Sequence, residues 1–130
     1  MYRFIVFLLV ASSLPVSGQS ENIKGNVYSL KGRLSKKFQV TPPCGHIAFA
    51  TVMEFKVLSF SGADLNKDKT QVILTCPGFY PPGVFKKGLV YDLIVADQNQ
   101  SAFEWLIINR KVLKKSTKPQ FWVIEIRKSE

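Results

Sequence analysis

The chain has 130 residues and a formal net charge of +9, because 18 Lys and Arg side chains outnumber 9 Asp and Glu side chains. Apolar residues make up 46% of it, which is enough for the core of one small domain and excludes an intrinsically disordered chain. The excess of positive charge favours anionic partners, such as acidic polysaccharide, anionic lipid head groups or extracellular nucleic acid.

The first eighteen residues have the pattern of a secretory signal peptide. Arg3 supplies a positive charge, and residues 4–10 are apolar without a break. Residues 16–18 are the small residues that signal peptidase prefers at its cleavage site. The apolar run is too short for a transmembrane helix, which needs about 20 residues. An uncleaved anchor is the alternative. We expect residues 1–18 to be removed, which leaves a secreted or periplasmic protein without an integral membrane segment.

The next segment, 19–43, is a polar, basic lead-in with at most one short strand near 26–30. Two prolines and a glycine then interrupt the chain. Residues 46–60 alternate between two faces and are rich in β-branched and aromatic side chains, which predicts a strand. This run is long for a strand, so we expect a bend or bulge, as in a strand that wraps a small barrel.

Further strands are predicted over 71–76, 90–96 and 121–127, the last with Trp122, Ile124 and Ile126 on one face. Residues 103–109 also alternate, although their apolar positions would suit a helix running to Lys115. We favour a strand to about Asn109, followed by a basic turn or short helix. The pattern predicts a single all-β domain over 44–130. We expect a five- or six-stranded barrel, with an immunoglobulin-like sandwich as the alternative.

The two cysteines, Cys44 and Cys76, are predicted to form a disulfide, because an even count in an exported protein indicates pairing. A redox-active or metal-binding pair is the alternative. The chain has no C-x-x-C arrangement and only one histidine, so it gives little support to a redox or metal pair.

Catalysis has little support in the sequence. His46 is the only histidine, and no nucleophile motif such as G-x-S-x-G accompanies it. We therefore expect no enzyme, no catalytic residue, no metal site and no cofactor.

Basic residues cluster in two runs, which form a cationic face for a polyanion if the fold brings them together and a merely solvated surface if it does not. The runs are Lys31, Arg33, Lys36 and Lys37, and Arg110, Lys111, Lys114, Lys115 and Lys118.

The second candidate binding feature is the aromatic pair Phe79 and Tyr80, in a loop that flanking prolines stiffen. A rigid aromatic loop loses little entropy on docking, which suits a protein contact. Alternatively, the two rings close the open end of the barrel.

Several residues in the middle of the chain carry a family resemblance: Val72, Leu74, Cys76, Pro77, Phe85, Gly88, Tyr91 and Leu93, after the step Cys44-Gly45. This pattern resembles netrin-like modules, the oligonucleotide/oligosaccharide-binding (OB) barrels of netrins, complement C-terminal domains and tissue inhibitors of metalloproteinases. The resemblance covers residues 44–96 and implies a barrel used for binding, without an enzyme site. The metalloproteinase inhibitors chelate metal through an N-terminal Cys and carry many more disulfides. Their inhibitory chemistry therefore does not transfer to this chain.

The sequence thus predicts an exported, non-enzymatic binding module that contacts an unidentified protein or an acidic envelope polymer. The alternative is a small inhibitor or immunity-type protein of an exported enzyme.

Overall fold

The computed structural model describes residues 22–36, 39–62, 68–113 and 120–130. The predicted signal peptide lies outside these ranges, as do Lys37, Lys114, Lys115 and Lys118. In chain order the elements are β1 (Val27–Leu34), β2 (Phe49–Phe60), β3 (Lys69–Thr75), the 3-10 turn η1 (Pro77–Phe79), β4 (Val90–Ala96), β5 (Leu106–Ile107), the 3-10 turn η2 (Arg110–Val112) and β6 (Phe121–Lys128). Across the described ranges, no helix has the length and hydrophobicity that a membrane crossing requires.

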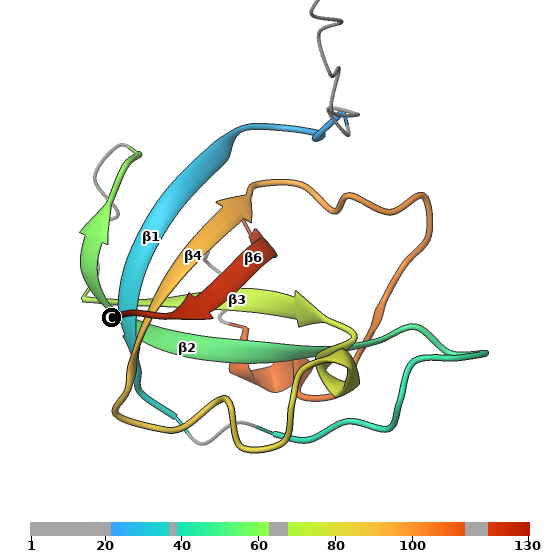
Figure 1. The fold of residues 1–130 in the computed structure, drawn as a ribbon. Helices are drawn as coiled ribbons and strands as arrows, with labels where there is room; N and C mark the ends of the chain where they lie inside the picture. Colours follow the sequence, from blue (N-terminus) through green and yellow to red (C-terminus); the bar gives the residue numbers. More distant parts are fainter. Residues whose placement is uncertain (1–21, 37–38, 63–67, 114–119) are drawn as a thin grey trace, which may run out of the picture.

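Five of the strands close into a barrel (Figure 1). β1 pairs antiparallel with both β2 and β4, β2 pairs antiparallel with β3, and β4 pairs antiparallel with β6. A parallel pairing of β3 with β6 completes the ring, and β5 lies outside it, parallel to the start of β2. The predicted all-β barrel of five to six strands is confirmed. The immunoglobulin-like alternative is wrong, because a single closed ring has no second sheet to pack against.

The first strand of the barrel lies inside the segment expected to be a lead-in. β1 spans eight residues, with Leu30, Gly32 and Leu34 facing the interior and basic or polar residues facing out. A Cβ atom at Gly32 would lie 2.8 Å from the Cβ of Phe55, so only glycine lets β1 approach β2 this closely. The barrel therefore begins at Val27, ahead of the boundary expected at Cys44.

The long strand β2 contains the expected irregularity. Lys31 of β1 lies opposite Ser59, but the next residue, Gly32, lies opposite Val57, so Leu58 is an extra residue in β2. Such a bulge bends a strand and increases its twist, which lets β2 wrap the barrel.

A second bulge in β6 changes which side chains face the core. Ile94 of β4 lies opposite Glu125 and Val95 lies opposite Val123, so Ile124 is skipped. The expectation that Trp122, Ile124 and Ile126 share one face is therefore wrong. Only Ile126 is in the interior cluster, joined there by Phe121 and Val123.

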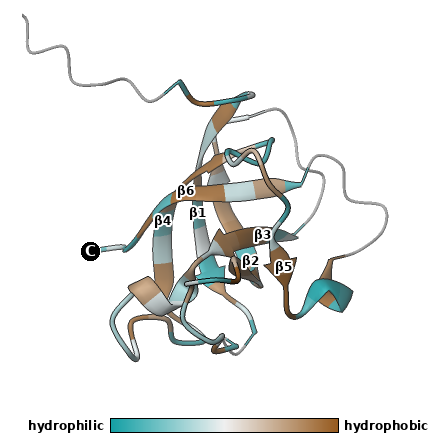
Figure 2. Cartoon of the chain, turned by 90° about the vertical axis from the view of Figure 1, so that its right-hand side faces the viewer, coloured by the Kyte–Doolittle hydropathy of each residue, from teal (hydrophilic) through white to brown (hydrophobic). Residues whose placement is uncertain are grey.

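The ambiguous segment 103–113 is neither a full strand nor an α-helix. Its strand, β5, is limited to two residues that pair with Phe49 and Ala50, and the basic turn that follows is η2. Side chains of this segment cover the outer face of β2 and β3, where Ala50, Val52 and Ile73 would otherwise meet water. We call residues 105–113 the cap (Figure 2).

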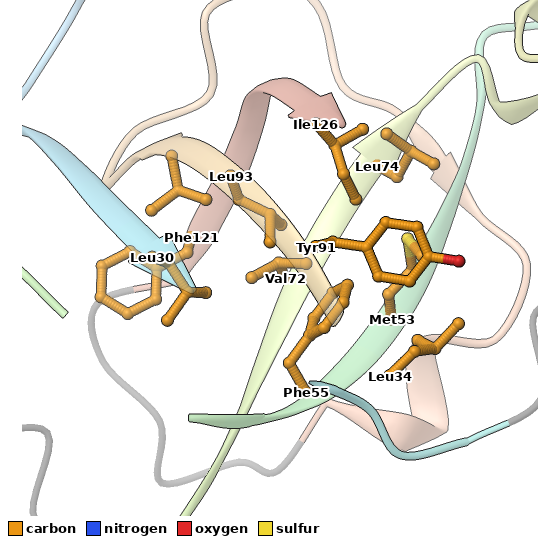
Figure 3. Packing of buried hydrophobic residues seen from close by; sticks show 11 residues of the cluster. Leu30, Leu34, Met53, Phe55, Val72, Leu74, Tyr91, Leu93, Phe121 and Ile126 are labelled. Carbon is orange, nitrogen blue, oxygen red and sulfur yellow. The ribbon is translucent and has the colours of Figure 1, made fainter. Parts of the chain in front are cut away.

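The interior of the barrel holds the main core, shown in Figure 3. Full burial of one such side chain stabilises the fold by roughly 1.5–3 kcal/mol. Aromatic side chains close both ends of the barrel: Tyr28, Phe60 and Phe121 at one end, and Tyr80, Phe85 and Tyr91 at the other.

The predicted disulfide is confirmed. Cys44 and Cys76 are bonded, with Cα atoms 5.5 Å apart and a sequence separation of 32. Cys76 directly follows β3 and lies in the left-handed region, at φ 46°, and its N–H donates to the carbonyl of Phe49. The bond therefore joins the loop before β2 to the loop after β3 at the same end of the barrel.

Candidate functional site

Three cations lie side by side on the outer face of the barrel. Arg33 of β1 is the partner of Lys56 in β2, and Lys56 is the partner of Lys69 in β3. All three side chains are exposed, because they alternate with the buried residues Leu34, Phe55 and Thr70. We call this set the basic row. Neighbouring strands are roughly 4.8 Å apart, and like charges placed directly opposite each other destabilise a sheet.

A buried carboxylate lies beside the row. The side chain of Glu54 is only 4% exposed, and its two oxygens accept hydrogen bonds from Gln71 Nε2 and Ser35 Oγ, both at 3.0 Å. The ammonium groups of Lys36 and Lys69 lie 3.5 Å and 3.9 Å from the same carboxylate. Glu54 therefore connects the end of β1, β2 and β3.

The environment of Glu54 keeps its carboxylate charged. Burial raises the pKa of Glu54, but hydrogen bonds from Gln71 and Ser35 and the charge of Lys36 together outweigh it, so the pKa lies below its ordinary value. The charged Glu54 thus pairs with Lys36 and Lys69. We call the basic row and Lys36 together the basic patch; the exposed Asp68 lies at its edge, where its carbonyl accepts from the N–H of Val57. None of the ion pairs among the described residues includes Lys56.

The structure places the predicted basic runs only partly as expected. Arg33 and Lys36 of the first run join Lys56 and Lys69, which the sequence analysis did not single out. Lys56 had an outward position in the strand expected over 46–60, whereas Lys69 lay just before the strand expected over 71–76 and carried no such signal. Lys31 is instead 4.0 Å from Asp92, on the neighbouring strand β4.

Of the second run, Arg110 and Lys111 lie exposed on η2. Figure 2 shows η2 as a hydrophilic turn beside β5. The residues that follow, Val112 and Leu113, pack on the outer face of β2 and β3. Arg110 and Lys111 therefore lie on the same side of the barrel as the basic patch. Lys114 and Lys115 lie outside the described residues.

The side chain of Asn109 fastens the cap to the edge of β2. Its Oδ1 accepts from the N–H of Val52 at 2.7 Å, and its Nδ2 donates to the carbonyl of Val52 at 3.0 Å. The N–H groups of Leu106 and Ile108 donate to the carbonyls of Ala48 and Ala50. Asn109 thereby continues the parallel ladder with a side chain, and it fixes the chain immediately before Arg110.

The two residues of the aromatic loop have different surroundings. Phe79 is 76% exposed, whereas Tyr80 is half-buried and packs on Phe85 with ring centroids 5.2 Å apart. Burial raises the pKa of Tyr80, and the negative charge of Glu125 raises it further. Tyr80 therefore closes the barrel end, and Phe79 alone presents its ring outward.

The aromatic loop and the basic row lie at opposite ends of β2. The loop is tied to Phe49 through the N–H of Cys76, while the row crosses β2 at Lys56, seven residues further along. Seven strand residues span roughly 20 Å. The aromatic loop and the basic row are therefore separate surfaces.

Comparison with protein-family models, curated proteins and solved structures finds no match to this chain. The candidate site consequently rests on the geometry alone. In the part of the chain that the structure describes, no group of three or more His, Cys, Asp or Glu side chains is arranged to hold a metal ion.

A groove of about 450 Å³ adjoins the basic row on the outer face of β1, where Lys31 is two residues from Arg33, and has a different charge pattern. Lys31, Asp92 and Arg127 lie in one row across β1, β4 and β6, so positive and negative charges alternate there. With Glu125 also present, this groove carries no excess of either sign. The basic patch is therefore the stronger candidate for an anionic ligand.

Proposed function

We propose that this protein is an exported, non-enzymatic binding module that holds an anionic polymer on the basic patch. The observation that carries the proposal is the basic row, Arg33–Lys56–Lys69, with Lys36 beside it and Glu54 as the one buried carboxylate among them. Facing cations weaken a sheet, and a polyanion would relieve that repulsion while releasing its own condensed counterions.

The netrin-like resemblance supports this proposal. In OB barrels the face of the second and third strands is a binding surface for oligonucleotides and oligosaccharides. Lys56 and Lys69 lie on the second and third strands of this barrel. We extend the proposal to an OB-type, netrin-like binding role on that basis.

Export is part of the proposal. The pattern of residues 1–18 predicts a signal peptide. The Cys44–Cys76 disulfide suits an oxidising compartment, such as the extracellular space or the periplasm.

A second candidate function is a protein contact through Phe79, as in an inhibitor or immunity-type protein. Its support is the exposed ring on a loop that the disulfide and the Cys76–Phe49 hydrogen bond hold in place. A preorganised loop loses little entropy on binding. Such a complex would be stoichiometric and would resist salt, whereas polyanion binding weakens as salt rises.

The test is the affinity of residues 19–130 for immobilised dextran sulfate as a function of salt. We expect a linear fall of log K with log salt concentration, and a slope that becomes shallower by about one for each lysine replaced in Lys56→Gln and Lys69→Gln. Lys24→Gln is the matched control, because Lys24 is exposed and lies nine residues before Arg33, beyond the start of β1. Equal losses in all three variants would refute the role of the basic patch.

A further inference from the structure

The basic row runs across the strands rather than along one of them. From Arg33 to Lys69 it crosses two strand spacings, which is roughly 10 Å. At the β1 end, Arg33 Nη1 donates to the carbonyl of Gly88 at 2.7 Å, which brings the turn with the exposed Lys87 beside the row. The cations thus follow one another in a line around the barrel.

The surface beneath this line is convex, because the row follows the circumference of a closed barrel (Figure 1). A flexible polymer can follow such a line and contact each cation in turn. A flat anionic surface, such as a lipid bilayer, touches a convex wall only at its crest. The shape therefore favours a chain over a membrane.

The row itself contains no aromatic side chain. Among the described residues, the aromatic side chains near it pack against other parts of the barrel. Phe55 and Tyr91 pack against each other inside the barrel, and Phe60 belongs to the cluster that closes one end. The exposed rings, Phe79 and Phe103, belong to loops near the Phe49 end of β2. Proteins that bind single-stranded nucleic acid combine cations with aromatic platforms for the bases. Within the described ranges, this row offers the cations alone.

We infer that the polymer is an acidic polysaccharide, bound across the strands along the basic row through its sulfate or carboxylate groups. This inference rests on the proposed function and specifies its ligand. Lysine ammonium groups act as point charges that accept an anion from many directions. A polysaccharide with a charged group on successive sugars needs only such a line of point charges, without stacking and without base edges to read.

The experiment compares four probes on residues 19–130 at physiological salt. The probes are a heparin-derived octasaccharide, a polygalacturonate oligomer, an oligo-dT of the same total charge as the octasaccharide, and phosphatidylglycerol vesicles. Anisotropy measures the first three and co-sedimentation measures the last. We expect at least one oligosaccharide to bind at least about tenfold more tightly than oligo-dT, and the vesicles to bind more weakly still.

The variants locate the site. Lys56→Gln should weaken oligosaccharide binding several-fold, and Lys24→Gln should leave it unchanged, with circular dichroism confirming that both remain folded. Oligo-dT binding as tight as the oligosaccharides would overturn the inference while leaving the proposed function intact. Vesicle binding that exceeds both would overturn the inference and would also contradict a polymer as the ligand of the basic patch. If none of the four probes binds, the proposed function itself fails.

Discussion

Glu54→Gln separates the structural role of the carboxylate from its electrostatic effect on a ligand. The replacement keeps the size of the side chain and removes its charge. Hydrogen bonds to a charged group contribute about 1.5–3 kcal/mol, against about 1 kcal/mol for neutral ones. Lys36 and Lys69 are each more than half exposed, at 57% and 55%, so water can solvate them after the change. We therefore expect a loss of about 1–3 kcal/mol in the free energy of unfolding at pH 7.

The pH dependence gives an independent check with a definite sign. The pKa of Glu54 is lowered in the folded protein from its ordinary value of 4.5, so its stabilising contribution is complete above that value. As the pH falls through the lower, folded-state pKa, this contribution is lost. Urea unfolding at pH 7 and at several values below 4.5 should show the wild type and Glu54→Gln converging in stability.

The same substitution should strengthen binding to an acidic oligosaccharide. Removing one negative charge from among four cations raises the local positive potential. A unit charge roughly 8 Å from a ligand anion in a water-like medium contributes about 0.5 kcal/mol, or about twofold in affinity. Stability should therefore fall while affinity rises. Unchanged stability at pH 7, or a parallel decline of both quantities, would refute this account of Glu54.

Three further predictions follow from other contacts. Asn109→Ala should lower the free energy of unfolding by about 2–4 kcal/mol in urea titration, because it leaves both backbone groups of the buried Val52 without partners; a change below about 0.5 kcal/mol would contradict it. Joint replacement of Cys44 and Cys76 by serine should cost about 3–4 kcal/mol in calorimetry, and the oxidised wild type should weigh about 2 Da less than the reduced protein by intact mass. Phe79→Ala should leave the dextran sulfate affinity unchanged, since the loop lies roughly 20 Å from the basic row; a large loss would place Phe79 in the polyanion site.

The local order of apolar and polar residues was enough to predict a strand wherever the two alternate without interruption. The expected strand 90–96 and the observed β4 have the same bounds, because every second residue of that segment is apolar and buried. The bulge in β2 was also predictable, since a strand of that length must bend to wrap a small barrel. The disulfide could be predicted because the chain has two cysteines and the pattern of a signal peptide.

The prediction was incomplete where the alternation of a strand is interrupted, or where its length depends on pairing elsewhere in the barrel. β1 was expected as a short strand in a lead-in, because Gly32 contributes no side chain to its inner face and its outer face is basic. In β6 the bulge at Ile124 reverses the alternation partway, which no local pattern reveals. β5 is short because it pairs only with the start of β2, and that limit depends on how β1 joins β2 further along.

The sequence alone determined the all-β class, the excess of positive charge, the strand segments and the covalent link, because these depend on composition and on neighbours within a few residues. Only the tertiary structure decided which cations meet. Arg33, Lys56 and Lys69 form a row because the registers of β1 with β2 and of β2 with β3 align them. Register is set by the packing of the inner face around the whole barrel. The same closure separates Phe79 from the basic row and buries Glu54 beside it.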